Sequence, residues 1–210
     1  MDVTGTNTYP NEEEYCNADL VDDNTFQGYT IKAGTDNADQ LIGTANKDLI
    51  LGLDGDDQIQ GSGGDDIICG GNGQDHLVGD SYPNVGQDHL VGESYPNVII
   101  SQPGNLGKDF IFGQEGNDTI NSNEELERDY GDPGDILYGG PGDDAVTGND
   151  SNDKLSGGDG NDGLDAGDGN DLLDGGPGDD WCYDNQVETF PTFLNCEDLD
   201  DPPVTIYRKK

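Results

Sequence analysis

The chain has 210 residues, of which only 30% are hydrophobic and 34 are glycine, so an ordinary globular core is not expected. Asp and Glu outnumber Lys and Arg by 46 to 8, a net charge of −38. This charge argues against nucleic acid and anionic membrane surfaces as partners, because both would repel the chain, and it favours cations. Low hydrophobicity with high net charge is also typical of disorder, so composition alone leaves an unfolded acidic chain open.

Residues 1–33 have no internal repeat but contain several aromatic side chains. Residues 1–20 lack the basic start and apolar run of a signal peptide, and no window of the chain approaches the ~18 apolar residues of a membrane span. We therefore expect a soluble chain, in a mature or recombinant form. Because the ends of a repeat array expose apolar interior and unpaired strand edges, we predict an N-terminal cap over residues 1–33.

A nine-residue period begins at residue 34 and continues to about residue 183. Aspartates mark it in two blocks: Asp39, Asp48, Asp57, Asp66, Asp75, Asp88, Asp109, Asp118, Asp135, Asp144, Asp153, Asp162, Asp171 and Asp180. Two residues after each aspartate stands one apolar residue with mostly polar neighbours: Leu41, Ile50, Ile59, Ile68, Leu77, Leu90, Ile111, Ile120, Leu137, Val146, Leu155, Leu164, Leu173 and Cys182. The period therefore organises most of the chain.

Each unit reads as a glycine-rich turn followed by a short strand. One apolar residue between polar neighbours fits a three-residue strand with a single inward side chain, because strand side chains alternate between faces. A spacing of nine cannot form an amphipathic helix, and glycine before each aspartate suits backbone with positive φ. Strands this short are unstable alone, so successive units must stack into sheets.

The units GGPGDDAVT (139–147), GGDGNDGLD (157–165) and AGDGNDLLD (166–174) resemble the RTX (repeats-in-toxin, haemolysin-type) calcium-binding nonapeptide GGxGxDxUx. The resemblance covers about residues 34–183. It implies an all-β fold, a parallel β-roll (right-handed β-solenoid) with two units in each coil and non-repeat caps at both ends. Turns on one edge are then eighteen residues apart, with calcium held between turns n and n+2.

The resemblance also implies a ligand set of oxygen atoms, which suits calcium better than magnesium, since calcium accepts six to eight oxygens in flexible geometry. The carboxylates are those of the fourteen aspartates, with ions shared by Asp39 and Asp57, Asp48 and Asp66, Asp57 and Asp75, Asp144 and Asp162, Asp153 and Asp171, and Asp162 and Asp180. Carbonyls of the turn glycines Gly55, Gly64, Gly73, Gly116, Gly142, Gly160, Gly169 and Gly178 complete the shells. Fourteen turns allow up to about twelve Ca²⁺ ions.

Several units depart from the pattern. Asn37, Asn46 and Ser151 replace the glycine two residues before the aspartate, and Pro133 stands at this place before Asp135. Residues 73–85 recur almost unchanged as 86–98, which lengthens the aspartate interval and predicts loops at 81–84 and 94–97. We expect an irregular region from 79 to 135 in which ion sites are lost.

Four cysteines and two histidines remain to be placed. The cysteines lack the spacing of a zinc site, so we predict disulfides, Cys182 with Cys196 and, by what is left, Cys16 with Cys69, although reduced thiols stay open. Disulfides favour an oxidising compartment. His76 and His89 precede inward residues, so both are expected to point to solvent from opposite sheets rather than to form a metal site.

The C-terminal residues 184–210 lose the repeat and are predicted to form a second cap. No HExxH or GxSxG motif occurs, so we expect no catalysis. Aspartates stacked at ~4.8 Å without metal would repel by roughly 3 kcal/mol per pair at an effective dielectric of 20, so calcium binding and folding should be one event. The predicted function is that of a secreted, extracellular calcium-binding protein.

Two other functions are weighed against it. One is a structural or adhesive element whose rolls self-associate into extracellular fibres or a surface layer, which exposed strand edges at both ends would favour. The other is ice binding, which resembles what some RTX rolls do with rows of threonine in the turns. Thr35 and Thr44 alone fit such a row in this sequence.

Overall fold

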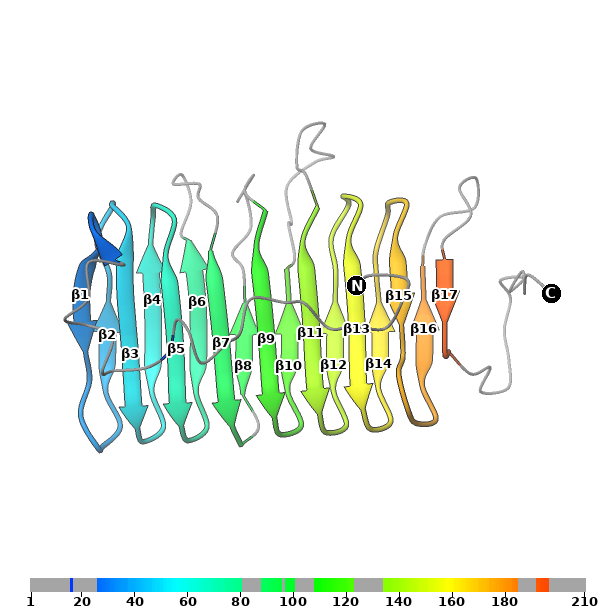
Figure 1. Ribbon diagram of the computed structural model, residues 1–210, viewed down its shortest axis with the longest axis horizontal. Helices are drawn as coiled ribbons and strands as arrows, with labels where there is room; N and C mark the ends of the chain where they lie inside the picture. Colours follow the sequence, from blue (N-terminus) through cyan, green and yellow to red (C-terminus); the bar gives the residue numbers. More distant parts are fainter. Residues whose placement is uncertain are drawn as a thin grey trace.

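The computed structural model describes residues 16, 26–80, 88–95, 97–100, 108–122, 134–184 and 192–196. These residues form two parallel sheets that face each other along the whole length of an elongated roll (Figure 1). The nine-stranded sheet contains β1 (Thr30–Ala33), β3 (Asp48–Asp54), β5 (Ile67–Asn72), β7 (His89–Ser94), β9 (Phe110–Glu115), β11 (Ile136–Pro141), β13 (Lys154–Asp159), β15 (Leu172–Asp174) and β17 (Thr192–Leu194). The eight-stranded sheet contains β2 (Gln40–Ile42), β4 (Gln58–Ser62), β6 (His76–Asp80), β8 (Val98–Ile100), β10 (Thr119–Asn121), β12 (Ala145–Thr147), β14 (Gly163–Asp165) and β16 (Trp181–Tyr183). The predicted parallel β-roll is confirmed.

Consecutive strands alternate between the sheets, so each coil of the roll uses one strand from each. Strands in neighbouring coils pair in parallel, and in regular coils the paired residues are eighteen apart, as Leu155 and Leu173 are. A strand of three residues has few hydrogen bonds of its own, so the pairing with both neighbouring coils supplies most of its order. The period of nine is thus half of one coil.

The core is a single row of inward side chains between the sheets. All the predicted apolar positions from Leu41 to Leu173 are buried there, and Cys182 packs against the end of the row. The row also contains Ile99 and Ala166, which were not predicted. Ile99 follows Asn97 at the same offset that separates aspartate from its apolar residue elsewhere.

The strands of the nine-stranded sheet are longer than predicted. Six of them have six or seven residues, because pairing continues past the inward residue into the glycine turn, as in the register of Leu53 with Gly71. The outer face of this sheet also carries a second buried apolar cluster, made of Phe26, Leu49, Leu51, Ile67 and Cys69. The sequence pattern had predicted polar residues on that face.

The region from 79 to 135 keeps its strand register although its turns are longer. Ile68 pairs with Leu90 and Leu90 with Ile111, at separations of 22 and 21 residues in place of eighteen. The extra residues therefore fall between the strands in the sequence and leave the pairing unchanged. The predicted loop at 81–84 lies outside the described residues, while Tyr95 of the other predicted loop is 60% exposed.

Both predicted disulfides are present, Cys16 with Cys69 and Cys182 with Cys196, and no described cysteine is free. Strands β1 and β17 belong to segments predicted as caps and pair with β3 and β15. The remainder of the predicted caps lies outside the described residues, apart from Cys16, Cys196 and a few neighbours of β1 and β17. No helix within the described part of the chain is long and apolar enough to cross a membrane.

The prediction for the histidines is half right. His76 on β6 is exposed, and it belongs to the other sheet from His89, which is on β7. His89, however, does not simply face solvent, because its ring stacks on Phe110 and Phe112, with centroid distances of 5.6 and 5.3 Å. Burial lowers the pKa of His89 to about 4, so its imidazole is neutral at physiological pH.

Candidate metal centre

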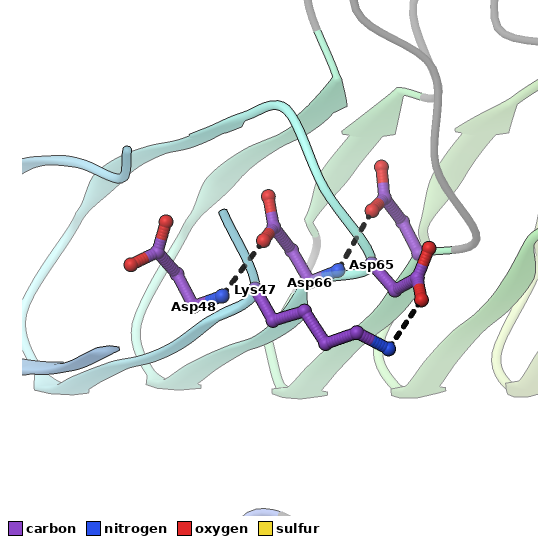
Figure 2. A network of polar contacts seen from close by, with 5 residues as sticks. Lys47, Asp48, Asp65 and Asp66 are labelled. Atoms are coloured by element: carbon purple, nitrogen blue, oxygen red, sulfur yellow. Dashed lines mark hydrogen bonds and ion pairs between the residues drawn. The ribbon is translucent and has the colours of Figure 1, made fainter. Parts of the chain in front are cut away.

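The turns lie on the two edges of the roll, where aspartates from successive coils form two continuous hydrogen-bonded rows, called here the aspartate ladders. In each step, the backbone N–H of one aspartate donates to Oδ1 of the aspartate one coil further on. Figure 2 shows such a step, from the Asp48 nitrogen to the Asp66 carboxylate, over 2.9 Å. The same figure shows the ion pair between Lys47 and Asp65, which lies outside the ladder.

The two ladders contain all fourteen predicted aspartates. One ladder precedes the strands of the nine-stranded sheet and runs through Asp48, Asp66, Asp88, Asp109, Asp135, Asp153 and Asp171, with N···Oδ1 distances of 2.8–3.0 Å. The other precedes the strands of the eight-stranded sheet and runs through Asp39, Asp57, Asp75, Asn97, Asp118, Asp144, Asp162 and Asp180, with distances of 2.7–2.9 Å. The carboxylates predicted to share ions are therefore neighbours.

Asn97 is the ladder member that the sequence reasoning missed. Its Oδ1 accepts the backbone N–H of Asp75 over 2.9 Å, and its own N–H donates to Asp118. Because Oδ1 takes that hydrogen bond, the amide Nδ2 occupies the place where an aspartate has Oδ2. The string Asn97-Val98-Ile99 has the offset of the repeat, so a search that accepted asparagine in place of aspartate would have found it.

The second carboxylate oxygen of the ladder aspartates points into the aspartate's own turn. We number each turn so that the aspartate is position 6 and the first glycine is position 1. Buried Oδ2 atoms have no hydrogen-bond partner in Asp57, Asp118, Asp144, Asp162, Asp171 and Asp180. Leaving a buried polar group unpaired costs about 1–3 kcal/mol, and more for a charged group. A cation bound to these oxygens would remove that cost.

Backbone oxygens meet these carboxylates in the same turns. At position 1, a Cβ added to Gly139 or Gly157 would lie closer than 3.0 Å both to Oδ2 of its own turn's aspartate and to the position-1 carbonyl oxygen of the next coil. At position 4, a Cβ added to Gly73 or Gly160 would also lie closer than 3.0 Å to a carbonyl oxygen of a neighbouring coil. Each such turn is therefore lined by oxygens and has room only for glycine.

Positive φ at two positions opens the turn. Position 2 has positive φ in Gly140 and Gly158, and also in Leu53, Ser62 and Gln114, where a side chain is present. The predicted glycines at position 4 with positive φ are Gly55, Gly64, Gly73, Gly116, Gly142 and Gly160, whereas Gly169 and Gly178 are not among the residues with positive φ. Peptide carbonyls rotated in this way form the concave, oxygen-lined turns.

Several buried carboxyl groups of the turns have a raised pKa. Burial is the largest cause of a raised pKa in each case: to about 6 for Asp118 and Asp162, and to about 7 for Asp144 and Asp171. Neighbouring carboxylates of the same ladder raise the pKa of Asp144 and Asp171 further. Without a metal, the negative charge of these turns is unfavourable.

The composition of the turns decides which ion they fit. No three His, Cys, Asp or Glu side chains among the described residues converge closely enough to hold a metal by themselves. The atoms that line the turns are carboxylate and backbone carbonyl oxygens, in contrast to the nitrogen and sulfur shell of a structural zinc site. One carboxylate oxygen with several carbonyls is the donor set that calcium accepts.

The comparison with protein families agrees with this geometry. The model of the RTX calcium-binding nonapeptide repeat matches residues 33–59, 42–77, 82–120, 130–164 and 164–183. The chain belongs to the RTX calcium-binding repeat family. A comparison with curated proteins gave no match. The repeats of this chain are those of a calcium-binding β-roll. The family matches also extend across residues 82–120, within the region that had been expected to be irregular.

Proposed function

We propose that this chain is a secreted module whose folding is driven by calcium ions bound in the turns of the roll. The observation that carries the proposal is the set of buried Oδ2 atoms without donors, which in all but Asp171 lie beside a carbonyl oxygen of the next coil. Calcium placed there would satisfy both and would offset the repulsion within each ladder. The ligands would be the ladder aspartates and the carbonyls of the glycine turns.

The energetics favour a coupling of binding and folding. A site with a dissociation constant of about 0.1 mM contributes about 1.4 kcal/mol at about 1 mM calcium. Six such sites, one for each of the aspartates with an unpartnered Oδ2, would add about 8 kcal/mol, which is comparable to the 5–15 kcal/mol stability of an ordinary domain. A core of one side chain per strand supplies less apolar burial than such a domain has.

Two features support an extracellular destination. The disulfides Cys16–Cys69 and Cys182–Cys196 persist in oxidising compartments and are rare in the cytosol. The sites are built mainly from carbonyls with one carboxylate oxygen each, and such weakly charged sites fill at extracellular calcium concentrations.

Calcium titration of the disulfide-intact chain, followed by far-UV circular dichroism and calorimetry, tests the proposal. We expect little β structure in EDTA and a cooperative gain of β structure as calcium is added. An equally β-rich spectrum in EDTA would show that folding does not depend on calcium.

A matched pair of variants tests the ligand role within one turn. Asp144→Asn replaces the buried Oδ2 by an amide nitrogen but keeps Oδ1 for the Asp118 N–H. Asp143→Asn changes the charge equally at an exposed position and keeps an acceptor for the Asn161 N–H. We expect a raised calcium midpoint and fewer bound ions for Asp144→Asn alone. Equal effects of both variants would reduce the role of Asp144 to general electrostatics.

The alternative of end-to-end assembly is favoured by one observation. Of the six exposed large apolar side chains in the described residues, four lie on the outermost strands: Ile31 on β1, Ile42 on β2, Trp181 on β16 and Leu194 on β17. Unpaired strand edges with exposed apolar side chains can pair with a second copy. Sedimentation of the calcium-loaded chain over a range of concentrations distinguishes a monomer from growing fibres.

A further inference from the structure

Three turns differ from the open, oxygen-lined type described above. They span residues 34–39, 43–48 and 148–153, and their position 2 is Thr35, Thr44 or Asn149. None of these three residues has positive φ. Instead, the backbone N–H at position 2 donates to Oδ2 of the turn's own aspartate, over 2.6, 2.6 and 2.8 Å. The oxygen left without a donor in open turns is hydrogen-bonded here.

The two threonine turns add a second donor to the same oxygen. The hydroxyl of Thr35 lies 2.9 Å from Asp39 Oδ2, and the backbone N–H of Asn37 donates in turn to that hydroxyl over 3.3 Å. The turn at 43–48 repeats this arrangement, with Thr44 Oγ1 3.0 Å from Asp48 Oδ2. The two turns lie on opposite edges of the roll, so the arrangement follows from the local sequence GTxNxD and not from shared neighbours.

In the third turn the side chain at position 2 is an asparagine, and it donates to the neighbouring coil instead of to its own turn's aspartate. The side-chain nitrogen of Asn149 donates to Asp135 Oδ2 over 3.2 Å and to the Ser122 carbonyl over 3.3 Å. The Ser151 hydroxyl donates to Asp153 Oδ1 over 3.0 Å. An amide N–H group thus stands between two coils, where it contacts one carboxylate oxygen and one backbone carbonyl.

Residue type explains why the two threonine turns close. A β-branched threonine strongly disfavours positive φ, which an open turn needs at position 2, whereas glycine adopts it freely. All three turns lack glycine at position 4, where they have Asn37, Asn46 or Ser151. Without positive φ at position 2, the backbone N–H of that residue reaches Oδ2 and takes the place of a cation.

We propose that the residues at positions 2 and 4 decide whether a turn takes calcium, and that the turns at 34–39, 43–48 and 148–153 are metal-free because their own hydrogen bonds replace the ion. The inference rests on the proposed calcium binding of the open turns. On this proposal the roll begins with two turns that need no calcium, 34–39 and 43–48, and the calcium-dependent coils follow toward the C-terminus.

The chain offers a reciprocal swap as a test. The turn at 34–39 reads GTDNAD and the turn at 52–57, one coil further on the same edge, reads GLDGDD. Thr35→Leu with Asn37→Gly should open the first turn and add one bound ion. Leu53→Thr with Gly55→Asn should close the second and remove one. Thr35→Ser, which keeps the hydroxyl donor, is the control and should leave the count unchanged.

Native mass spectrometry of the full, disulfide-bonded chain in calcium counts the ions, and circular dichroism in calcium confirms that each variant is folded. Unchanged counts in both swap variants, or an added ion in Thr35→Ser, would overturn the inference. If the closing swap fails to fold, the opening swap decides by itself, because an unchanged count then contradicts the proposal. Absence of calcium from the parent chain would instead refute the proposed function, and the inference with it.

Discussion

The regular block from 134 to 184 and the middle region from 79 to 135 reach the same architecture from different spacings. In the regular block, ladder aspartates are eighteen residues apart, whereas in the middle the separations are 21, 22 and 26. The N–H···Oδ1 distances nevertheless stay between 2.7 and 3.0 Å in both. The period of nine is therefore not what the roll requires. Its requirement is the pair formed by a ladder residue and the apolar residue two places later.

The largest expected effect tests whether the two regions are packed equally well. Ile111 in the middle and Leu155 in the regular block are both essentially inaccessible to solvent. Replacing either with alanine removes three methyl or methylene groups and leaves a cavity, so we expect each to cost about 3 kcal/mol. Urea unfolding in saturating calcium measures the cost. A loss below about 1 kcal/mol for Ile111→Ala would show that the middle is loosely packed.

The next effect is the pH dependence of the calcium-free chain. Burial raises the pKa of Asp118 to about 6 and of Asp144 and Asp171 to about 7, whereas unfolded carboxyls titrate near pH 4. Between about pH 4 and 7 the folded chain binds more protons than the unfolded chain, so its stability falls as pH rises. Far-UV circular dichroism in EDTA should therefore show more β structure at pH 4.5 than at pH 7.5.

Calcium should reverse this slope, because protons and calcium then compete for the same oxygens. Asp118→Asn, in the middle region, should flatten the EDTA slope as Asp144→Asn does in the regular block. A β content that rises with pH in EDTA would contradict the assigned direction.

A smaller effect concerns position 2 of the turn at 113–118. Gln114 has a φ of 75°, where the regular block has Gly140 and Gly158. A left-handed conformation costs a residue with a side chain about 1–2 kcal/mol, and glycine recovers part of this at an entropic cost in the unfolded state. We expect Gln114→Gly to stabilise the calcium-loaded chain by about 0.5–1 kcal/mol in urea unfolding. Gln74→Gly, at an exposed position 5, is the control and should not stabilise.

The smallest effect comes from deleting residues 81–84. The deletion joins Asp80 to Val85 and produces the string GDVGQD. The interval from Asp75 to Asp88 then shortens from thirteen positions to nine. Since halving a loop changes its closure free energy by only about 0.6 kcal/mol, we expect a change no larger than this. Loss of cooperative unfolding after the deletion would show that the longer turn is required for the register.

The sequence predicted the parts of the fold that depend on local rules. Aspartate and glycine at fixed offsets identified the turns, and one apolar residue in each unit identified the inward row. The prediction failed where another residue type can do the same work, as with Asn97 and Ile99. It also failed where tertiary contacts decide, since nothing local showed that the face around Leu49 and Leu51 would be buried or that His89 would stack on phenylalanines.

The ligand set was also predicted only in part. The repeat predicted every aspartate of the two ladders, but it did not distinguish between the two oxygens of a carboxylate. Hydrogen bonding within the ladder commits Oδ1 to a backbone N–H, and this depends on how neighbouring coils stack. Whether Oδ2 is open or occupied then depends on the residue four places before the aspartate, Thr35 for Asp39 and Gly140 for Asp144.

The stacking of the coils also has a mechanical consequence. A regular coil of eighteen residues advances the roll by one strand spacing of about 4.8 Å, yet the same residues pulled straight span about 60 Å. A coil that opens under tension would therefore span more than ten times the length that it contributes to the folded roll. Since coils contact only their neighbours, they would open one after another from the ends, and the disulfide Cys182–Cys196 would limit how much length the last coil releases. The roll is thus also a compact store of extensible chain.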